Sequence, residues 1–210
     1  MAQELRDILS KYIPSASVDT VAEWILMYKI RVNITRSRAS KSGDYRSPGN
    51  GSGHRISINH DLNPYHFLIT FVHETAHLTA WMRHKDKNIL PHGKEWKAEF
   101  QKLMYPLMHE QVFPSDVLQA LQTYMQDPAA TSCSDLNLLR SLRRYDTNGV
   151  MYVEDLPENC IFELKSGKTF IKGKKIRKLF HCREVHTSHV YHVHPMAEVV
   201  RMENPQTVKQ

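Results

Sequence analysis

The chain has 210 residues, of which 41% are hydrophobic and 24% charged, a composition typical of a globular protein that is long enough to bury a sizeable core. No apolar stretch approaches the roughly 18 residues of a membrane span, and the first residues lack the basic-then-apolar form of a secretory signal. The formal net charge of +6 favours an anionic partner without naming one.

Two helices and two strands are predicted in the first sixty residues. Apolar residues recur at helical spacing in residues 2–13 and 17–29. Residues 30–35 and 54–59 alternate apolar and polar side chains, which predicts two half-buried strands. The intervening residues 36–53 are rich in Ser, Gly and Arg, and we expect them to form a loop. A strand with an exposed edge can pair with the extended backbone of a peptide.

The motif His-Glu-Thr-Ala-His at residues 73–77 lies in an apolar-periodic run from residue 64 to about residue 82, which predicts one helix. An asparagine cap and a proline at the first helical position mark its start. Because His73 and His77 are four residues apart, their imidazoles share a helix face and can bind one zinc ion at roughly 2.0–2.1 Å each. Glu74 points about 100° away, close enough to take a proton from water at the metal without being a ligand.

Zinc needs a third protein ligand, and three downstream side chains are candidates. Glu95 and Glu99 lie on a second predicted helix, residues 94–110, and a carboxylate from such a helix completes the site in one group of zinc peptidases. His92 lies in the loop that opens this helix, from which it can swing onto the metal. Imidazole is at least as good a zinc ligand as carboxylate, so we favour His92 and keep the two glutamates as alternatives.

With these residues in place, the sequence resembles the SprT/Spartan-like zinc metallopeptidases. The resemblance rests on the motif at 73–77, a third histidine fifteen residues later, and His-Gly-Lys-Glu-Trp at 92–96, and it covers about residues 20–110. It implies that the three histidines bind zinc and that Glu74 is the general base. Eukaryotic members of this family cleave proteins crosslinked to DNA and are activated by DNA, so the resemblance also implies DNA-associated protein substrates.

Beyond residue 110, helices are predicted at 115–126 and 134–144, and after residue 146 the pattern changes to short strands separated by turn-forming residues. Members of the family that the sequence resembles usually carry a zinc ribbon in this region, with four cysteines in two close pairs. This chain keeps only Cys160 and Cys182 there, and we expect apolar packing to replace the zinc. With Cys133, expected to be structural, the three widely spaced cysteines are typical of a reducing compartment, which predicts a cytoplasmic protein.

A basic segment lies within the predicted strands. Between residues 165 and 178 there are seven Lys or Arg residues and no acidic residue, with apolar and aromatic side chains interleaved. Such a segment can hold a nucleic-acid backbone through counterion release and can stack on bases. A solvated basic hairpin is the alternative. The candidate nucleic-acid contacts are Lys165, Lys168, Lys172, Lys174, Lys175, Arg177 and Lys178.

Together these patterns predict an α+β fold: a zincin-like helical domain (1–126) with a short sheet beside the motif helix, a helical linker (127–145), a small antiparallel β unit (146–200) and a flexible tail (201–210). We expect a zinc-dependent endopeptidase that acts on DNA-associated or DNA-crosslinked proteins, with no membrane partner. Two alternatives remain: a non-catalytic DNA- or protein-binding module with structural zinc, and a general cytoplasmic zinc peptidase without DNA dependence. A group that stabilises an oxyanion is also expected, with three unranked candidates: Tyr45, Tyr65 and His84.

Overall fold

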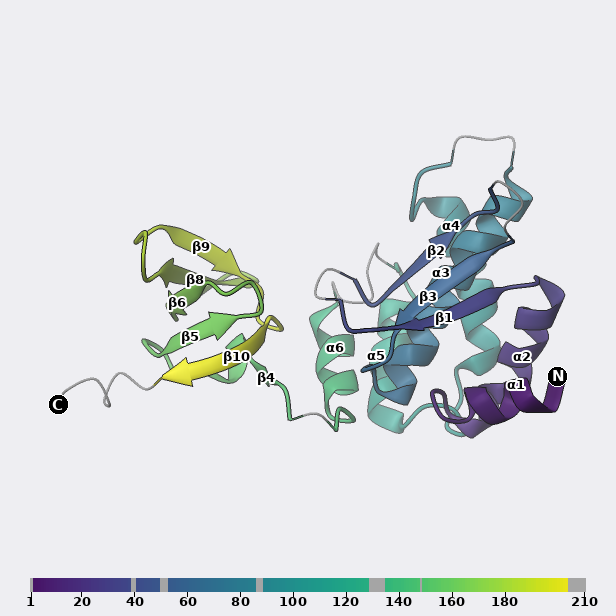
Figure 1. Cartoon of the computed structure of the whole chain (residues 1–210), viewed down its shortest axis with the longest axis horizontal. Helices are drawn as coiled ribbons and strands as arrows, with labels where there is room; N and C mark the ends of the chain where they lie inside the picture. Colours follow the sequence, from purple (N-terminus) through teal and green to yellow (C-terminus); the bar gives the residue numbers. More distant parts are fainter. Residues whose placement is uncertain are drawn as a thin grey trace. The chain divides into compact units, whose positions relative to one another are not determined.

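The computed structural model describes residues 2–38, 41–49, 53–85, 89–128, 135–147 and 149–203. The chain forms two compact units, Met1–Asp146 and Thr147–Gln210 (Figure 1). Each unit has its own apolar core, and helices and two sheets together confirm the α+β class. None of the described helices combines the length and the apolar character needed to cross a bilayer. Cys133 lies outside the described residues.

Helices make up most of the first unit. Residue 106, a proline, falls where α4 gives way to a short 3-10 turn, as its missing N–H requires. The longest helix carries the motif and begins as expected, because the side chain of Asn63 accepts a hydrogen bond from the backbone N–H of His66 at 3.0 Å. The helices are α1 (Ala2–Leu9), α2 (Val18–Met27), α3 (Pro64–Arg83), α4 (Lys94–Met104), α5 (Ser115–Tyr124) and α6 (Leu136–Arg143).

A three-stranded sheet packs against α3 and has the order β1-β3-β2 (Figure 1). Strands β1 (Arg31–Thr35) and β3 (Arg55–Asn59) correspond to the two predicted strands. They pair in parallel, and β3 buries its apolar side chains. Strand β2 (Gly43–Arg46) pairs antiparallel with β3 at the edge of the sheet. It lies inside residues 36–53, so the prediction of a plain loop there is wrong. Its polar sequence carries no strand pattern, and pairing with β3 makes it a strand.

Helix α6 lies within residues 127–145, for which a helical linker was predicted. Its Leu138 and Leu142 are buried in the core of the first unit, and α6 packs against α5. The side-chain amide of Asn63, the cap of α3, donates to the carbonyl oxygen of Leu142 at 2.9 Å and to the carboxylate of Asp146 at 2.6 Å. The start of the motif helix is therefore fastened to the end of this unit.

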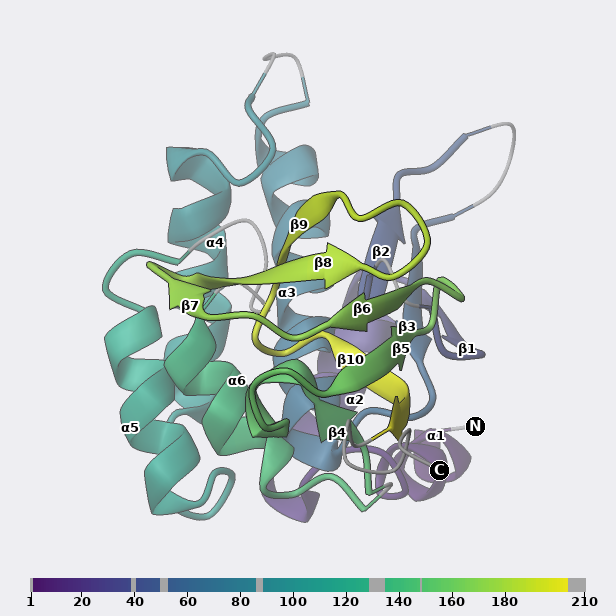
Figure 2. The same ribbon diagram turned by 90° about the vertical axis from the view of Figure 1, so that its left-hand side faces the viewer.

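The second unit is an antiparallel sheet with the order β4-β10-β5-β6-β8-β7, and β9 pairs with β8 (Figure 2). Residues 201–203, predicted to start a flexible tail, instead belong to β10, which pairs with both β4 and β5. Residues 204–210 lie outside the described residues. The strands are β4 (Met151–Tyr152), β5 (Ile161–Leu164), β6 (Thr169–Ile171), β7 (Lys175–Ile176), β8 (Leu179–Glu184), β9 (Val190–Val193) and β10 (Glu198–Glu203).

Candidate metal centre

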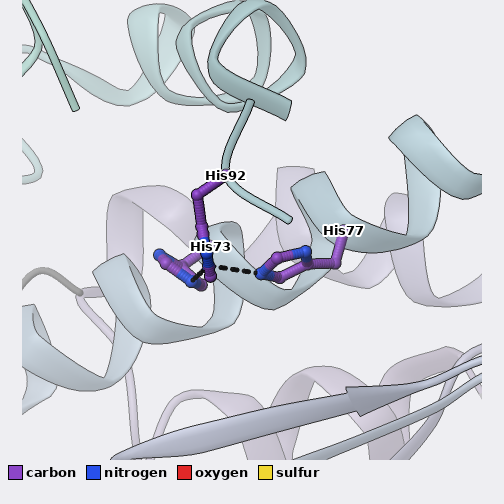
Figure 3. Close-up of side chains that lie close together, drawn as sticks. All are labelled: His73, His77 and His92. Carbon is purple, nitrogen blue, oxygen red and sulfur yellow. Dashed lines mark hydrogen bonds between the residues drawn. The ribbon is translucent and has the colours of Figure 1, made fainter. Parts of the chain in front are cut away.

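Three imidazoles converge beside α3 (Figure 3). The Nε2 atom of His92 lies 3.1 Å from Nε2 of His73 and 2.8 Å from Nε2 of His77. One nitrogen from each ring lies within 4.8 Å of the other two. Two ligands at roughly 2.0–2.1 Å from a tetrahedral ion are about 3.3 Å apart, so the three nitrogens have nearly the spacing that one ion requires. They can bind a metal ion.

His92 reaches this position from a tight turn. The N–H of Gly93 donates to the carbonyl of Leu90 at 2.9 Å, which closes a four-residue turn with Pro91 and His92 at its centre. His92 has φ of +60°, in the left-handed region that non-glycine residues rarely adopt. Proline followed by a positive φ is the type II turn pattern. The backbone is thus held in an unfavourable conformation at the residue that delivers the third imidazole, as is common at functional sites.

Trp96 of α4 supports the three imidazoles. Its ring centroid lies 4.6 Å from that of His73, 5.5 Å from that of His77 and 4.8 Å from that of His92. The indole N–H donates to the backbone carbonyl of His73 at 3.4 Å. The indole also stacks on the ring of Phe100, with ring centroids 5.0 Å apart, and Trp96 is only 1% exposed. A buried aromatic residue therefore fixes the positions of all three rings.

Burial keeps the imidazoles neutral. It lowers the pKa of His73 to about 3 and that of His77 to about 4, with their neighbouring imidazoles adding to the effect. Burial also lowers the pKa of His92. At neutral pH each ring is therefore uncharged and has a lone pair to give. Nδ1 of His73 is buried and has no hydrogen-bond partner among the described residues. Three neutral imidazoles are a donor set that suits Zn, Cu, Fe or Ni.

Glu74 follows His73 on α3 and is buried, without belonging to the group of three imidazoles. It is 7% exposed, and its pKa is raised to about 8 by burial and by the nearby negative charge of Asp44. The backbone N–H of Tyr45 on β2 donates to its carboxylate and opposes that rise in pKa. The pKa of this carboxyl group is therefore close to neutral pH, which suits a group that both accepts and donates a proton.

The alternative metal ligands are not brought to this place. The carboxylate of Glu99 is buried and pairs with Arg83 at 3.0 Å. The carboxylate of Glu95 lies 4.0 Å from the ammonium of Lys94. Within the described part of the chain, the three histidines are the group of at least three side chains with the spacing of metal ligands. His92 is therefore the third member of the cluster.

The three oxyanion candidates have different surroundings. The hydroxyl of Tyr45 lies 2.9 Å from Nδ1 of His54, on the strand whose backbone reaches Glu74. Tyr65 lies near the start of α3, where its ring centroid is 6.2 Å from that of Phe113 and 4.9 Å from that of Tyr145. His84 is the C-terminal cap of α3. Tyr45 is thus the candidate on an element that contacts the site.

The predicted basic segment divides into two groups in the second unit. Lys172 is 3% exposed, its ammonium donates to the carbonyls of Glu154 and Leu156, and it lies 4.3 Å from the ring centroid of Phe180. It is not available to a nucleic acid, so that prediction is wrong for Lys172.

The ammonium of Lys168 lies 3.1 Å from the hydroxyl of Tyr191 and 3.5 Å from the carboxylate of Glu184, and Lys165 pairs with Glu198. Both side chains are therefore already engaged. The exposed group is Lys174, Lys175, Arg177 and Lys178, around β7. We call these four the β7 cations; within the described residues none has an acidic partner.

Cys182 and His181 are neighbours on β8 and face opposite sides of the sheet. Cys160 and Cys182 are free thiols in the core, and burial raises the pKa of both. His181 stands directly opposite His192 on β9, with ring centroids 4.3 Å apart. We call these two residues the histidine pair. Because adjacent strand residues face opposite ways, Cys182 cannot join His181 in one site.

Comparison of the chain with protein-family models, with curated proteins and with solved structures finds no match in any of the three.

Proposed function

We propose that the protein is a zinc-dependent endopeptidase of the SprT/Spartan-like type. The observation that carries the proposal is the convergence of three neutral imidazole nitrogens within 4.8 Å, with a buried carboxyl group on the adjacent helix position. Three protein ligands with a position left for water are typical of catalytic zinc, whereas structural zinc is enclosed by four. A structural site has no use for Glu74.

The chain's own groups would carry the proton chemistry. Nε2 of each histidine would hold zinc, which when bound supplies a Lewis acid and makes water more acidic. The carboxylate of Glu74 accepts a proton as the water oxygen bonds to the peptide carbonyl carbon. It then delivers that proton to the amine nitrogen as the C–N bond breaks. The edge of β2 that faces away from β3 carries backbone groups with which an extended substrate could pair.

The test is the Glu74→Gln variant, with Glu95→Gln as the matched control. Wild-type protein loaded with zinc should cleave an unfolded protein such as casein. Glu74→Gln should lose about 100- to 10,000-fold in kcat, the usual worth of a general acid–base group. It should still bind one zinc per chain, measured by elemental analysis, and Glu95→Gln should match the wild type. Equal cleavage by Glu74→Gln and wild type would overturn the mechanism.

We further propose that the substrates are proteins held on DNA, and that DNA contacts the β7 cations. Four exposed cations lie within five residues at the hairpin turn. Phe170 and Phe180 are buried and cannot stack on bases, so contacts would be with phosphates.

Replacing the β7 cations with Gln tests this second proposal. The change should weaken binding to duplex DNA and reduce the slope of log K against log salt by about 0.9 per lost contact. Cleavage of free casein without DNA should stay the same, because the substitutions leave the metal centre unchanged. If the wild type does not bind DNA and its rate of cleavage is the same with and without DNA, the chain is a general peptidase instead.

A further inference from the structure

The open edge of the first sheet lies beside Glu74. Among the described residues, strand β2 has a strand partner on one side only, β3. The N–H of Asn59 donates to the carbonyl of Ser42 at 2.9 Å, so these two residues form a hydrogen-bonded pair. Hydrogen-bonded pairs alternate along an antiparallel ladder. Asp44 therefore points its backbone groups at β3, whereas Gly43 and Tyr45 point theirs at the open edge.

Glycine at position 43 allows β2 to approach α3 closely. A Cβ atom there would lie 2.6 Å from Cγ2 of Thr70 and 3.1 Å from both Cγ and Oε1 of Glu74. Contacts under 3.0 Å force something to move, so any side chain at Gly43 would push β2 away from the helix. The carboxyl group of Glu74 thus lies directly against this strand.

The closeness lets the strand hold the carboxyl group. The N–H of Tyr45 points at the open edge and donates to Glu74 rather than to another strand. Its phenol packs on the helix side, 5.9 Å from the ring centroid of His54, which in turn lies 5.3 Å from that of Trp81. The side chain and the backbone of Tyr45 therefore both engage structure on or beside α3.

The opposite face of β2 is fixed as well. Asp44 pairs with Arg38, and its carboxylate lies 3.3 Å from the ammonium of Lys41 and 3.4 Å from Nε of Arg46. Nε of Arg38 donates to the side-chain oxygen of Asn59 on β3 at 2.8 Å. An ion-pair network on one face and close packing on the other leave β2 little freedom.

We propose that β2 positions Glu74: the glycine at 43 brings the strand within reach, and the backbone N–H of Tyr45 then orients the carboxyl group toward the three imidazoles. Gly43 and Tyr45 act through Glu74 and are positioning residues. The role of this orientation in peptide cleavage rests on the proposed function, whereas the hydrogen bond itself does not.

Amide hydrogen exchange tests the hydrogen bond without any activity measurement. In Glu74→Ala the amide of Tyr45 should exchange about 2- to 10-fold faster at neutral pH, the range for a lost hydrogen bond between uncharged groups. The amides of Asp44 and Arg46, which pair with β3, should keep their rates. Glu74→Gln should restore most of the protection, because its amide oxygen still accepts. An unchanged Tyr45 rate in Glu74→Ala would overturn the proposal.

Kinetics test the orientation. Tyr45→Pro removes the N–H without breaking the ladder, because that N–H faces the open edge, and Tyr45→Ala removes the side chain alone. Relative to Tyr45→Ala, Tyr45→Pro should lose about tenfold or more in kcat, with KM and zinc content unchanged. Gly43→Ala should likewise lower kcat. Gly49→Ala, whose Cβ would meet nothing within 4 Å, is the control.

The outcomes separate the two proposals. If zinc-loaded wild type cleaves nothing while Tyr45 exchange responds to Glu74→Ala, the peptidase function fails and the hydrogen bond stands. If cleavage requires Glu74 but Tyr45→Pro and Tyr45→Ala have equal kcat, positioning by β2 is wrong. A rise in KM alone in Tyr45→Pro would also overturn it, since that result would assign the N–H to substrate binding.

Discussion

The two units each place histidines side by side, but in different ways. In the first unit, three rings point their Nε2 atoms at a common place, and His73 is 7% exposed. In the second, the rings of the histidine pair lie 4.3 Å apart across two strands with their planes tilted by 37°, and His192 is exposed. The first cluster gains a backbone conformation with φ of +60° at His92 and a buried tryptophan beneath it.

This difference shows what distinguishes a site from a neighbouring pair. The histidine pair follows from strand register alone, because residues directly opposite in an antiparallel ladder lie close together. The three-histidine cluster draws on a helix, a turn and a second helix, and it keeps its rings uncharged by burial. Strand register alone neither brings three ring nitrogens together nor keeps the imidazoles uncharged.

The three-histidine cluster and the histidine pair should differ most strongly in zinc binding. His77→Ala should lower zinc affinity by more than the roughly 10- to 100-fold that loss of an outer partner costs. His192→Ala should leave both the affinity and a stoichiometry of one zinc per chain unchanged. Isothermal titration calorimetry with zinc chloride measures both. Two equivalents of tight zinc in the wild type, reduced to one by His192→Ala, would show that the histidine pair is a site of equal rank.

Acid should destabilise the metal-free first unit through its histidines. Unfolded histidines take up protons near pH 6.5, whereas His73 and His77 resist until about pH 3 and 4. The unfolded state therefore binds more protons, and the free energy of unfolding falls as the pH drops from 6.5 toward 3. Glu74 acts oppositely between pH 8 and 4.5, because the native state protonates first.

Denaturant titrations across pH, with chelator present, measure this effect. A His73→Gln/His77→Gln double variant should flatten the loss of stability below pH 6.5, and Glu74→Gln should steepen it between pH 6.5 and 4.5. A double variant as acid-sensitive as the wild type would contradict this origin of the pH dependence.

Two lysines of the basic segment should differ in what their loss costs. Lys172→Met leaves two carbonyls without their donor and should lower the stability of the second unit by about 1–3 kcal/mol. Lys174→Met should change stability by less than about 0.5 kcal/mol while weakening DNA binding. Chemical denaturation and a fluorescence anisotropy titration measure the two effects. Equal losses of stability would contradict the buried role of Lys172.

The smallest effect concerns the strained turn. His92→Ala and His92→Gly both remove the third imidazole, but glycine adopts a positive φ without strain. His92→Gly should therefore be about 1 kcal/mol more stable than His92→Ala in the metal-free protein. Thermal unfolding of the two variants gives the difference. Equal stability would mean that the turn relaxes once the imidazole is gone.

Much of the first unit could be predicted because its signals are local. The helical period, the cap at Asn63 and the four-residue spacing of two histidines all act within one element. Pro91 before His92 was a further local signal, since proline favours the first central position of a turn.

The rest depends on contacts between distant residues. Strand β2 has the polar sequence Gly-Asp-Tyr-Arg, and pairing with β3 makes it a strand. Strand β10 pairs with β4 and β5, which lie some 35 to 50 residues earlier in the chain. Its extent past residue 200 therefore depends on partners that are distant in the sequence. Lys172 is buried because carbonyls of the 153–155 turn and its end accept from it, against the usual exposure of lysine.

The burial of α3 has a consequence for the order of assembly. Thirteen of its 20 residues are buried, most of them apolar, so packing against the sheet and α4 is enough to hold the helix. Small zinc domains, by contrast, collapse only around their ion. For the proposed zinc enzyme this order means that the polypeptide reaches its native form before the metal binds, and a chelator-stripped preparation should take up zinc without passing through a denatured state.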